Sequence, residues 1–237
     1  LALGALAGWA MAHPLFAIRG VTVAGDVNHN NALTLRANVA PRLRGTFFNL
    51  DLAQAQSAFE ALPWVRKATV QREFPNRLKV SLQEHRAVAY WGAQGESRLL
   101  NSFAEVFDAN VGELEQEALP HLNGPADQTQ AVLAMYQALQ PSFAALDLVL
   151  DELHLSARGS WSATLDTGAE LELGSGGVPE LLARTTTFVK TLTQVTARYG
   201  RKPDALESAD LRHEQGYAIR LRGVSTVAAE VVAPKPQ

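Results

Sequence analysis

Nine Arg, Lys, Glu and His side chains crowd the stretch LPWVRKATVQREFPNRLKVSLQEHRAVAYW, residues 62–91. Such a density is typical of a catalytic cluster, of a nucleic-acid-binding patch, or of the solvent face of β-strands. Apolar residues alternate with the charged ones through RKATVQRE and NRLKVSLQE, and FPN between them has the composition of a turn. We therefore interpret the charges as the outward positions of two strands. They are Arg66, Lys67, Arg72, Glu73, Arg77, Lys79, Glu84, His85 and Arg86.

The spacing of the histidines does not predict a metal site. None of them has another histidine two to five residues away, the spacing that a local zinc-ligand pair usually shows. The chain also has no cysteine, which excludes disulfides, thiolate nucleophiles and cysteine-based metal sites. The histidines are His13, His29, His85, His121, His154 and His213.

Three further patterns that carry chemistry in other proteins are incomplete here. LGSGG, residues 173–177, lies between a strand and a helix, but no lysine follows it as in a P-loop. Acidic residues at 113–117 and 147–152 have no partnering base or obvious apolar pocket. A G-x-S-x-G nucleophile elbow is missing from the sequence. We expect neither an enzyme nor a bound cofactor.

A basic stripe along the two strands is the remaining candidate for ligand binding. Two glutamates interrupt it, and no aromatic platform lies on adjacent strands as in RNA-binding sheets. The formal charge of −3, from 21 basic and 24 acidic residues, gives no overall field that attracts nucleic acid. We expect no nucleic-acid partner and favour strand surface or a protein-docking face. The stripe consists of Arg66, Lys67, Arg72, Arg77 and Lys79.

The first residues, LALGALAGWAMAHPLFAI, carry no Lys, Arg, Asp or Glu, and the first charge is Arg19. Eighteen uncharged residues approach the ~20 that a membrane helix needs. We interpret residues 1–16 as the outer part of a truncated transmembrane anchor, in which Pro14 marks an end or a kink. The alternative is the apolar region of a cleaved signal peptide, although no basic segment precedes it.

Residues 17–85 have the pattern of a small α+β domain. A strand ending at Gly25 is followed by a helix that Pro41 ends, and by a second helix that Asn49 or Asp51 caps. The two charged strands complete the order strand, helix, helix, strand, strand, with both helices covering one face of the sheet. The second helix has one apolar face, made of Leu52, Ala55, Phe59 and Leu62.

Residues 86–223 have the pattern of a β-sheet-rich domain with two helices. Short strands alternate with turns, and we expect ELEQEALPHLNGP to be a loop. One helix is expected to end at Pro141, and the longer one to run from Pro179 to a C-cap at Gly200. A final hairpin is followed by a loose tail at 224–237.

The order of these features resembles the FtsQ/DivIB family of bacterial cell-division proteins. The strongest match is the signature LPWV-x(6)-R-x-x-P-x-x-L-x-V-x-L-x-E-x-x-P/A-x-A-x-W, from Leu62 to Trp91. LNGP, from Leu122 to Pro125, and DLR, from Asp210 to Arg212, support it independently. The resemblance implies an anchor, a POTRA domain at 17–85 and a β domain at 86–223.

The family resemblance also implies a non-enzymatic divisome scaffold of the inner membrane. Most of the chain is then periplasmic and lies at the division septum, where it links early and late division proteins. The implied partners are FtsB and FtsL, bound through the β domain, with FtsK as a further candidate. His213 departs from the family pattern, which often has an aromatic residue after DLR.

The last strand, 217–222, is the candidate partner site. A final strand that is an open edge invites another chain to add a strand, and its arginines can meet acidic side chains there. In the POTRA domain, Val70 and Arg72 are expected on opposite sides of their strand, as a candidate recruitment face. The candidate partner-binding residues are Arg158, Asp210, Arg212, His213, Gly216, Tyr217, Ile219 and Arg220.

Three alternatives stay open at this point. A POTRA-containing, chaperone-like protein of outer-membrane assembly or secretion would carry further POTRA repeats or a barrel-forming region. A Gram-positive DivIB-like protein would carry a long charged tail in place of VSTVAAEVVAPKPQ. A cell-wall hydrolase would show turnover on peptidoglycan.

Overall fold

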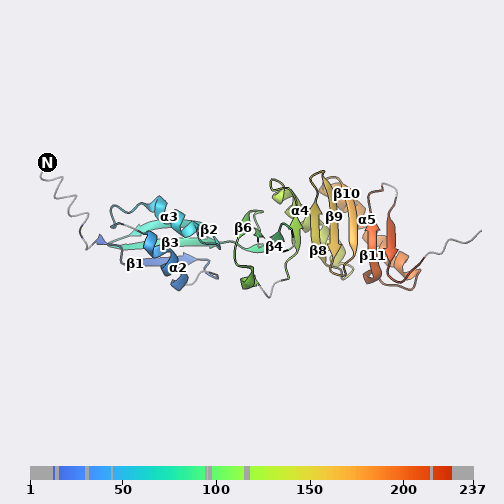
Figure 1. Ribbon diagram of the computed structural model, residues 1–237, viewed down its shortest axis with the longest axis horizontal. Coiled ribbons are helices and arrows are strands. Elements are labelled where there is room, and N and C mark those ends of the chain that lie inside the picture. The colour runs from blue at the N-terminus through green and yellow to red at the C-terminus, as the bar shows by residue number, and fades with distance from the viewer. Residues whose placement is uncertain are drawn as a thin grey trace, which may run out of the picture. The chain divides into compact units, whose positions relative to one another are not determined.

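The computed structural model describes residue 13 and residues 16–29, 32–43, 45–93, 95, 98–114, 118–213 and 216–225. The chain forms two compact units, which Figure 1 shows in blue to green and in green to red. The expected anchor, apart from residues 13 and 16, lies outside the described residues. The first unit comprises Leu1–Val88 and Ser97–Gln116, and the second Ala89–Glu96 and Glu117–Gln237.

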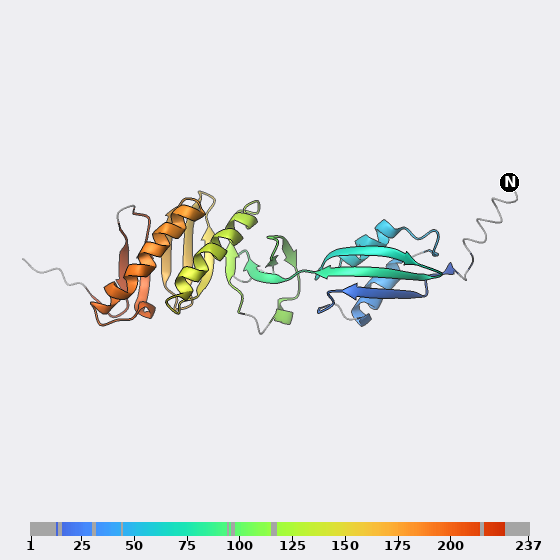
Figure 2. The ribbon, with the colours of Figure 1, turned by 180° about the vertical axis from the view of Figure 1, so that it is seen from behind.

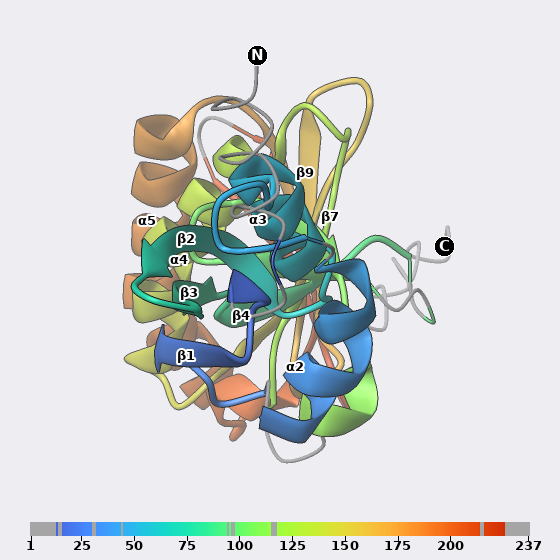
Figure 3. The same ribbon diagram turned by 90° about the vertical axis from the view of Figure 1, so that its left-hand side faces the viewer.

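The first unit has the expected order of strands and helices. Its sheet has the order β1-β3-β2, in which β3 pairs parallel with β1 and antiparallel with β2. Both helices lie on one face of this sheet (Figure 3). The elements are β1 (Gly20–Gly25), α2 (Ala32–Val39), the short 3-10 helix η2 (Ala40–Arg42), α3 (Leu52–Glu60), β2 (Val65–Glu73) and β3 (Arg77–Glu84).

Alternation along β3 builds the core of this unit. Leu78, Val80 and Leu82 are at most 4% exposed, whereas Arg77 and Lys79 face solvent, as the period of two predicts. The apolar face of α3 packs against them, as expected from its helical spacing. The core consists of Leu35, Val39, Leu50, Ala55, Ala58, Phe59, Leu62, Val65, Ala68, Val70, Leu78, Val80 and Leu82.

A β-hairpin from later in the chain belongs to the first unit. Its strands pair antiparallel, with Leu99 opposite Phe107. A tight turn joins them, in which the Asn101 side chain accepts hydrogen bonds from the N–H groups of Phe103 and Glu105. The elements of this segment are β5 (Arg98–Asn101), β6 (Val106–Asp108) and the 3-10 helix η3 (Val111–Leu114).

The second unit is a mixed sheet with the order β12-β11-β10-β9-β8-β7-β4. Helices α4 and α5 pack side by side on one face of it, as Figures 1 and 2 show from opposite sides. The elements are β4 (Ala87–Trp91), which enters from the first unit, β7 (His121–Asn123), α4 (Thr129–Ala144), β8 (Leu150–Leu155), β9 (Ser160–Leu165), β10 (Glu170–Ser175), α5 (Val178–Ala197), the 3-10 helix η4 (Pro203–Ala205), β11 (Leu206–Asp210) and β12 (Ala218–Leu221).

Three local expectations for this unit are wrong. Helix α5 ends at Ala197 with its C-cap at Arg198, two residues before the expected Gly200. The expected loop around LPHLNGP contains β7, which pairs parallel with both β4 and β8 and buries Leu122 completely. The three residues of β7 are too few to show a strand period, so only the neighbouring strands define it. Helix α4 also continues past Pro141 to Ala144, because Phe143 is fully buried and holds the last turn in place.

Candidate functional site

Strand β12 is the last strand in the order of the second unit's sheet. It pairs antiparallel with β11, with Ala209 opposite Ile219 and Asp210 opposite Ala218. Along its other side no described strand pairs with it. Since alternate residues of a strand direct their N–H and C=O groups to opposite edges, β12 presents backbone donors and acceptors along an open edge.

The entry to β12 is fixed by helix α5. The Tyr217 hydroxyl lies 2.6 Å from the Thr191 hydroxyl, and the Tyr217 ring meets Phe188 edge-on at 5.0 Å. Phe188 is fully buried in the core. By alternation, Ile219 and the buried Leu221 share the helix-facing side with Tyr217, so the expected alternation is present. The edge strand is therefore held in position before any partner arrives.

The opposite face of β12 carries charge. Arg220 is exposed, and its guanidinium lies 3.8 Å from the Glu207 carboxylate of β11, a long and solvent-exposed ion pair. Such a pair is weak, so Arg220 is able to exchange Glu207 for another carboxylate. Arg222 differs from Arg220 because its guanidinium donates to the backbone carbonyls of Asp204 and Thr167. It therefore stabilises the fold and is not available to a partner in the same way.

Asp210 and Arg212 form a tight pair at the end of β11. The Arg212 guanidinium donates to both Asp210 carboxylate oxygens, at 2.9 and 2.6 Å, and the Arg212 N–H donates to one of them at 3.0 Å. These bonds lower the pKa of Asp210 to about 2. The DLR motif is thus a turn at the end of β11 that its own hydrogen bonds hold together. His213, which follows it, is exposed.

The registers bring most of the expected partner-binding residues to one end of the sheet. Glu172 of β10 lies opposite Asp210, and Ser175 at the end of β10 lies opposite Ser160 at the start of β9. The β8–β9 turn with the exposed Arg158 therefore lies at the same end as the turn after β11. Sequence reasoning did not identify the three side chains that hold this region in place from neighbouring elements, namely Phe188, Thr191 and Glu207.

The POTRA residues singled out from the sequence are placed differently from the expectation. Val70 and Arg72 are two residues apart on β2 and so share one side of it; the expected opposite placement is wrong. Val70 is only 8% exposed and belongs to the core. Arg72 is exposed, yet its guanidinium donates to the Phe47 and Leu50 carbonyls at 2.6 and 2.7 Å.

Three charged positions of the stretch 62–91 are also not plain strand surface. Glu84 is 8% exposed and accepts hydrogen bonds from the N–H groups of Asn28 and His29. Arg66 sits where the β2–β3 register shifts, and it donates to both Glu105 oxygens at 2.7 and 2.9 Å. His85, the third, is half-buried and stacks on Phe107 at 4.1 Å.

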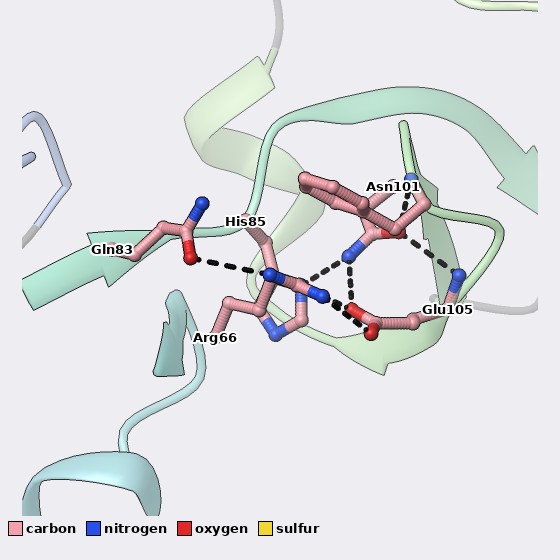
Figure 4. A network of polar contacts seen from close by, with 6 residues as sticks. Arg66, Gln83, His85, Asn101 and Glu105 are labelled. Carbon is pink, nitrogen blue, oxygen red and sulfur yellow. Dashed lines mark hydrogen bonds and ion pairs between the residues drawn. The ribbon is translucent and has the colours of Figure 1, made fainter. Parts of the chain in front are cut away.

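Figure 4 shows the polar network that joins the hairpin to the POTRA strands. The Asn101 amide group lies 2.8 Å from His85 Nδ1 and donates to Glu105 at 2.7 Å. The hydrogen bond from Arg66 is the main cause that lowers the pKa of Glu105 to about 2, and burial lowers the pKa of His85. Every charge in this network has a partner, which indicates a structural junction and not a reactive site.

The face of the second unit's sheet away from the helices carries a shallow acidic groove. Glu152 and His154 of β8 line it together with Glu170 and Glu172 of β10. Across the ranges that the structure covers, no group of three or more His, Asp or Glu side chains could hold a metal ion. Within the same ranges, no helix combines the length and the apolar composition that a membrane crossing requires.

Two family models match the chain, one for each part of the fold. The model "POTRA domain, FtsQ-type" matches residues 16–85, and the model "Cell division protein FtsQ/DivIB, C-terminal" matches residues 89–212. The second match ends at Arg212, so it includes the Asp210–Arg212 turn but not the edge strand β12.

Relatives over the whole length agree with the family models. The chain is 40% identical over 231 residues to the cell division protein FtsQ of Thiomonas arsenitoxydans, covering 94% of this chain and 83% of the relative. It is 39% identical over 220 residues to FtsQ of Burkholderia pseudomallei, with 91% and 84% covered. For FtsQ of Bordetella pertussis the identity is 34% over 245 residues, with 96% and 88% covered. With both structural units matched in order, the chain belongs to the FtsQ/DivIB family of cell-division proteins.

Proposed function

We propose that this protein is a non-enzymatic scaffold of the divisome, which binds an FtsB-like segment by strand addition along β12, with FtsL as a second partner. It then lies at the septum, held in the inner membrane by residues 1–16, with most of the chain in the periplasm. The proposal rests on the edge position of β12 in its sheet, in a chain that belongs to a family of cell-division proteins.

The backbone supplies the affinity in this proposal. An added strand satisfies the N–H and C=O groups along the edge of β12, and side chains of the partner then select the register. Because β12 has only four residues, the backbone bonds are few and the partner needs further contacts. The helix-facing side of the strand is already packed, so these contacts come from the opposite face and from the end of the sheet.

The charges at that end favour an acidic partner. Arg158 is exposed in its turn, and Arg220 is held only by the long pair with Glu207. Arg212 already has two short bonds to Asp210 and is less available. We assign Arg158 and Arg220 to the binding of partner carboxylates. His213 and Gly216 form the rim of the site, and the Asp210–Arg212 pair keeps the turn at the end of β11 in its shape.

The recruitment role of the POTRA domain stays part of the proposal in a narrower form. Arg72 remains a candidate because it is exposed, whereas the burial of Val70 means that its replacement would perturb the core. FtsK is the candidate for this contact. Co-localisation at midcell of an Arg72→Gln variant tests it.

The decisive experiment is a titration of the protein with a peptide of the periplasmic segment of FtsB from the same organism. Ile219→Pro, which removes a backbone N–H of the strand, and Arg220→Glu are expected to weaken binding about tenfold or more each. Ile219→Val keeps the backbone and is the matched control, expected within about twofold of the unmodified protein.

Two controls separate this function from the alternatives. A scrambled peptide of the same composition distinguishes selective strand addition from the general peptide binding of a chaperone-like POTRA protein. Incubation with peptidoglycan is expected to give no turnover, in contrast to a hydrolase. Unchanged affinity in both Ile219→Pro and Arg220→Glu would refute the edge-strand site, provided that amide NMR spectra show the rest of the second unit intact.

A further inference from the structure

Four phenylalanines from three separate segments meet at one end of the first unit. The Phe16 ring meets Phe48 edge-on at 4.9 Å, Phe47 meets Phe48 at 5.2 Å, and Phe47 meets Phe74 at 5.9 Å. We call these four residues the aromatic end. They are not part of the unit's core, which lies between the sheet and the helices.

The aromatic end is exposed to an unusual degree. Phe74 is 74% exposed and Phe48 is 44% exposed, although burial of aromatic surface is favourable. Single exposed apolar residues are common on protein surfaces, but contiguous exposed aromatic rings mark contact surfaces. The cluster therefore has the character of a contact surface.

The exposure is built into the loop that carries Phe47 and Phe48. Arg72 donates to the Phe47 and Leu50 carbonyls, and the Thr46 hydroxyl donates to the Asn49 side chain at 3.0 Å. The Leu50 N–H also bonds the Thr46 carbonyl at 2.9 Å. These bonds fix the backbone of the loop from which the Phe47 and Phe48 side chains project.

The aromatic end is joined directly to the start of the chain. The Phe47 N–H donates to the Phe16 carbonyl at 2.7 Å, and Ala17 forms a β-bridge with Thr46. The Arg19 N–H donates to the Asn76 carbonyl in the β2–β3 turn. The residues before Phe16 contain no Lys, Arg, Asp or Glu. The uncharged N-terminal sequence thus leads into this cluster.

Arginines outnumber carboxylates in the segments that carry the four rings. The segments 16–19, 45–50 and 72–77 contain three arginines and one glutamate, a net formal charge of +2. The glutamate, Glu73, lies 3.5 Å from Arg77, which leaves Arg19 and Arg72 without a carboxylate inside these segments. Exposed aromatic rings in segments with an excess of arginine have the composition of a surface that enters the headgroup region of an anionic bilayer.

We propose that the aromatic end docks onto the membrane surface, with Phe48 and Phe74 in the lipid interface and Arg19 at lipid phosphates. The inference deepens the proposed membrane location and rests on it. We favour a lipid surface as the partner of the aromatic end because the uncharged residues directly before Phe16, if they form the proposed anchor, place this end of the unit next to the bilayer. Docking would hold the POTRA domain against the membrane and limit its tumbling about the anchor.

The absence of cysteine from the chain makes a direct depth measurement simple. Phe74→Cys is labelled with a nitrobenzoxadiazole dye, and the full chain is reconstituted into vesicles with and without phosphatidylglycerol. We expect blue-shifted emission and quenching by lipids that carry a doxyl group near the headgroup, at least about twofold stronger than at a control site. Tyr199→Cys, at a 52% exposed position in the second unit, is that control.

A second variant tests the charge contribution. Arg19→Gln in the Phe74→Cys background is expected to reduce the quenching in vesicles that contain phosphatidylglycerol and to have little effect in neutral ones. Solvent-like emission at position 74, equal to that at position 199, would overturn the proposal. Blue-shifted emission without lipid quenching would overturn it as well, since the chain's own N-terminal residues or another protein would then cover the cluster.

The same labelled samples separate this inference from the proposed function. Titration with the FtsB peptide reports on β12, which lies in the other unit. If position 74 is not quenched by the lipids but the FtsB peptide binds, membrane docking alone is refuted. If position 74 is quenched but the FtsB peptide does not bind, the edge-strand site alone is refuted.

Discussion

At the scale of residues, similar charges in one short stretch have different roles because their surroundings differ. Arg77 and Lys79 follow the alternation of β3 and face water. Glu84, on the same strand, is buried and accepts backbone hydrogen bonds, which offset the cost of removing a carboxylate from water. Arg66 sits at a register shift, where a bulge redirects a side chain, and it reaches the hairpin carboxylate of Glu105.

The junction around Glu105 predicts a loss of local stability in acid. The folded pKa of Glu105, about 2, lies below its unfolded value, so its contribution is present above pH ~4.3 and is lost as pH falls toward 2. The folded pKa of His85 is also lowered. Its neutral form accepts the hydrogen bond from Asn101 at Nδ1. This contribution is present above the unfolded pKa of ~6.5 and is lost as pH falls through the lower folded pKa.

We expect Glu105→Gln to speed amide hydrogen exchange at Phe103 and Glu105 about two- to fivefold at neutral pH, since exposed ion pairs contribute little. Both amides bond the Asn101 side chain that Glu105 holds. The difference between variant and unmodified protein should shrink as pH falls toward 2. Glu207→Gln, which removes a long ion pair in the second unit, is the control and should leave these amides unchanged. Equal exchange rates in Glu105→Gln would show that Arg66 and Glu105 contribute nothing to the junction.

At the scale of elements, helix α3 shows how local signals define a helix. Asp51 lies directly before it in an extended conformation, and its carboxylate accepts from the N–H groups of Ala53 and Gln54 at 2.8 and 3.2 Å. These bonds satisfy donors that have no partner within the helix. The helix then presents Ala55 and Phe59 to the core at helical spacing.

Asp51→Ala is expected to lower the free energy of unfolding of the first unit by about 0.5–2 kcal/mol, because it removes both capping bonds. Asp51→Asn keeps an acceptor oxygen and should differ from the unmodified protein by only a few tenths of a kcal/mol. Urea unfolding, followed through the amide NMR signals of β2 and β3, measures both. An equal loss in the two variants would assign the effect to the charge and not to the cap.

At the scale of the whole molecule, the chain has two compact units. Leu78 is fully buried among residues of the first unit, and Leu153 is fully buried on β8 of the second. The proposed partner edge belongs to the second unit, and the aromatic end belongs to the first. Stability and partner binding should therefore respond separately to changes in the two cores.

Leu78→Ala is expected to destabilise the first unit by about 2–5 kcal/mol through the cavity that it leaves. The affinity for the FtsB peptide should stay within about twofold of the unmodified value. Leu153→Ala is the matched variant, expected to destabilise the second unit by a similar amount and to weaken the peptide affinity. Equal weakening by both variants would contradict the independence of the partner edge from the first unit.

The sequence by itself determined the features that depend on near neighbours. The order of elements in the POTRA domain and the inward Leu78, Val80 and Leu82 follow from periodicity, which acts within a few residues. Capping preferences limited the start of α3 to Asn49 or Asp51, and the structure shows that Asp51 is the cap. The family signature from Leu62 to Trp91 is local in the same sense. It indicated the family that the comparisons then showed.

Only the tertiary structure decided the features that depend on contacts between distant segments. The edge position of β12, the short strand β7 and the burial of Glu84 follow from strand pairing across many residues. The convergence of four phenylalanines at the aromatic end, from segments up to 58 residues apart, has no local signal either. A local pattern shows which side of a strand or helix is apolar, but the partner of that side is set by the fold as a whole, because packing and pairing join residues that the sequence keeps apart.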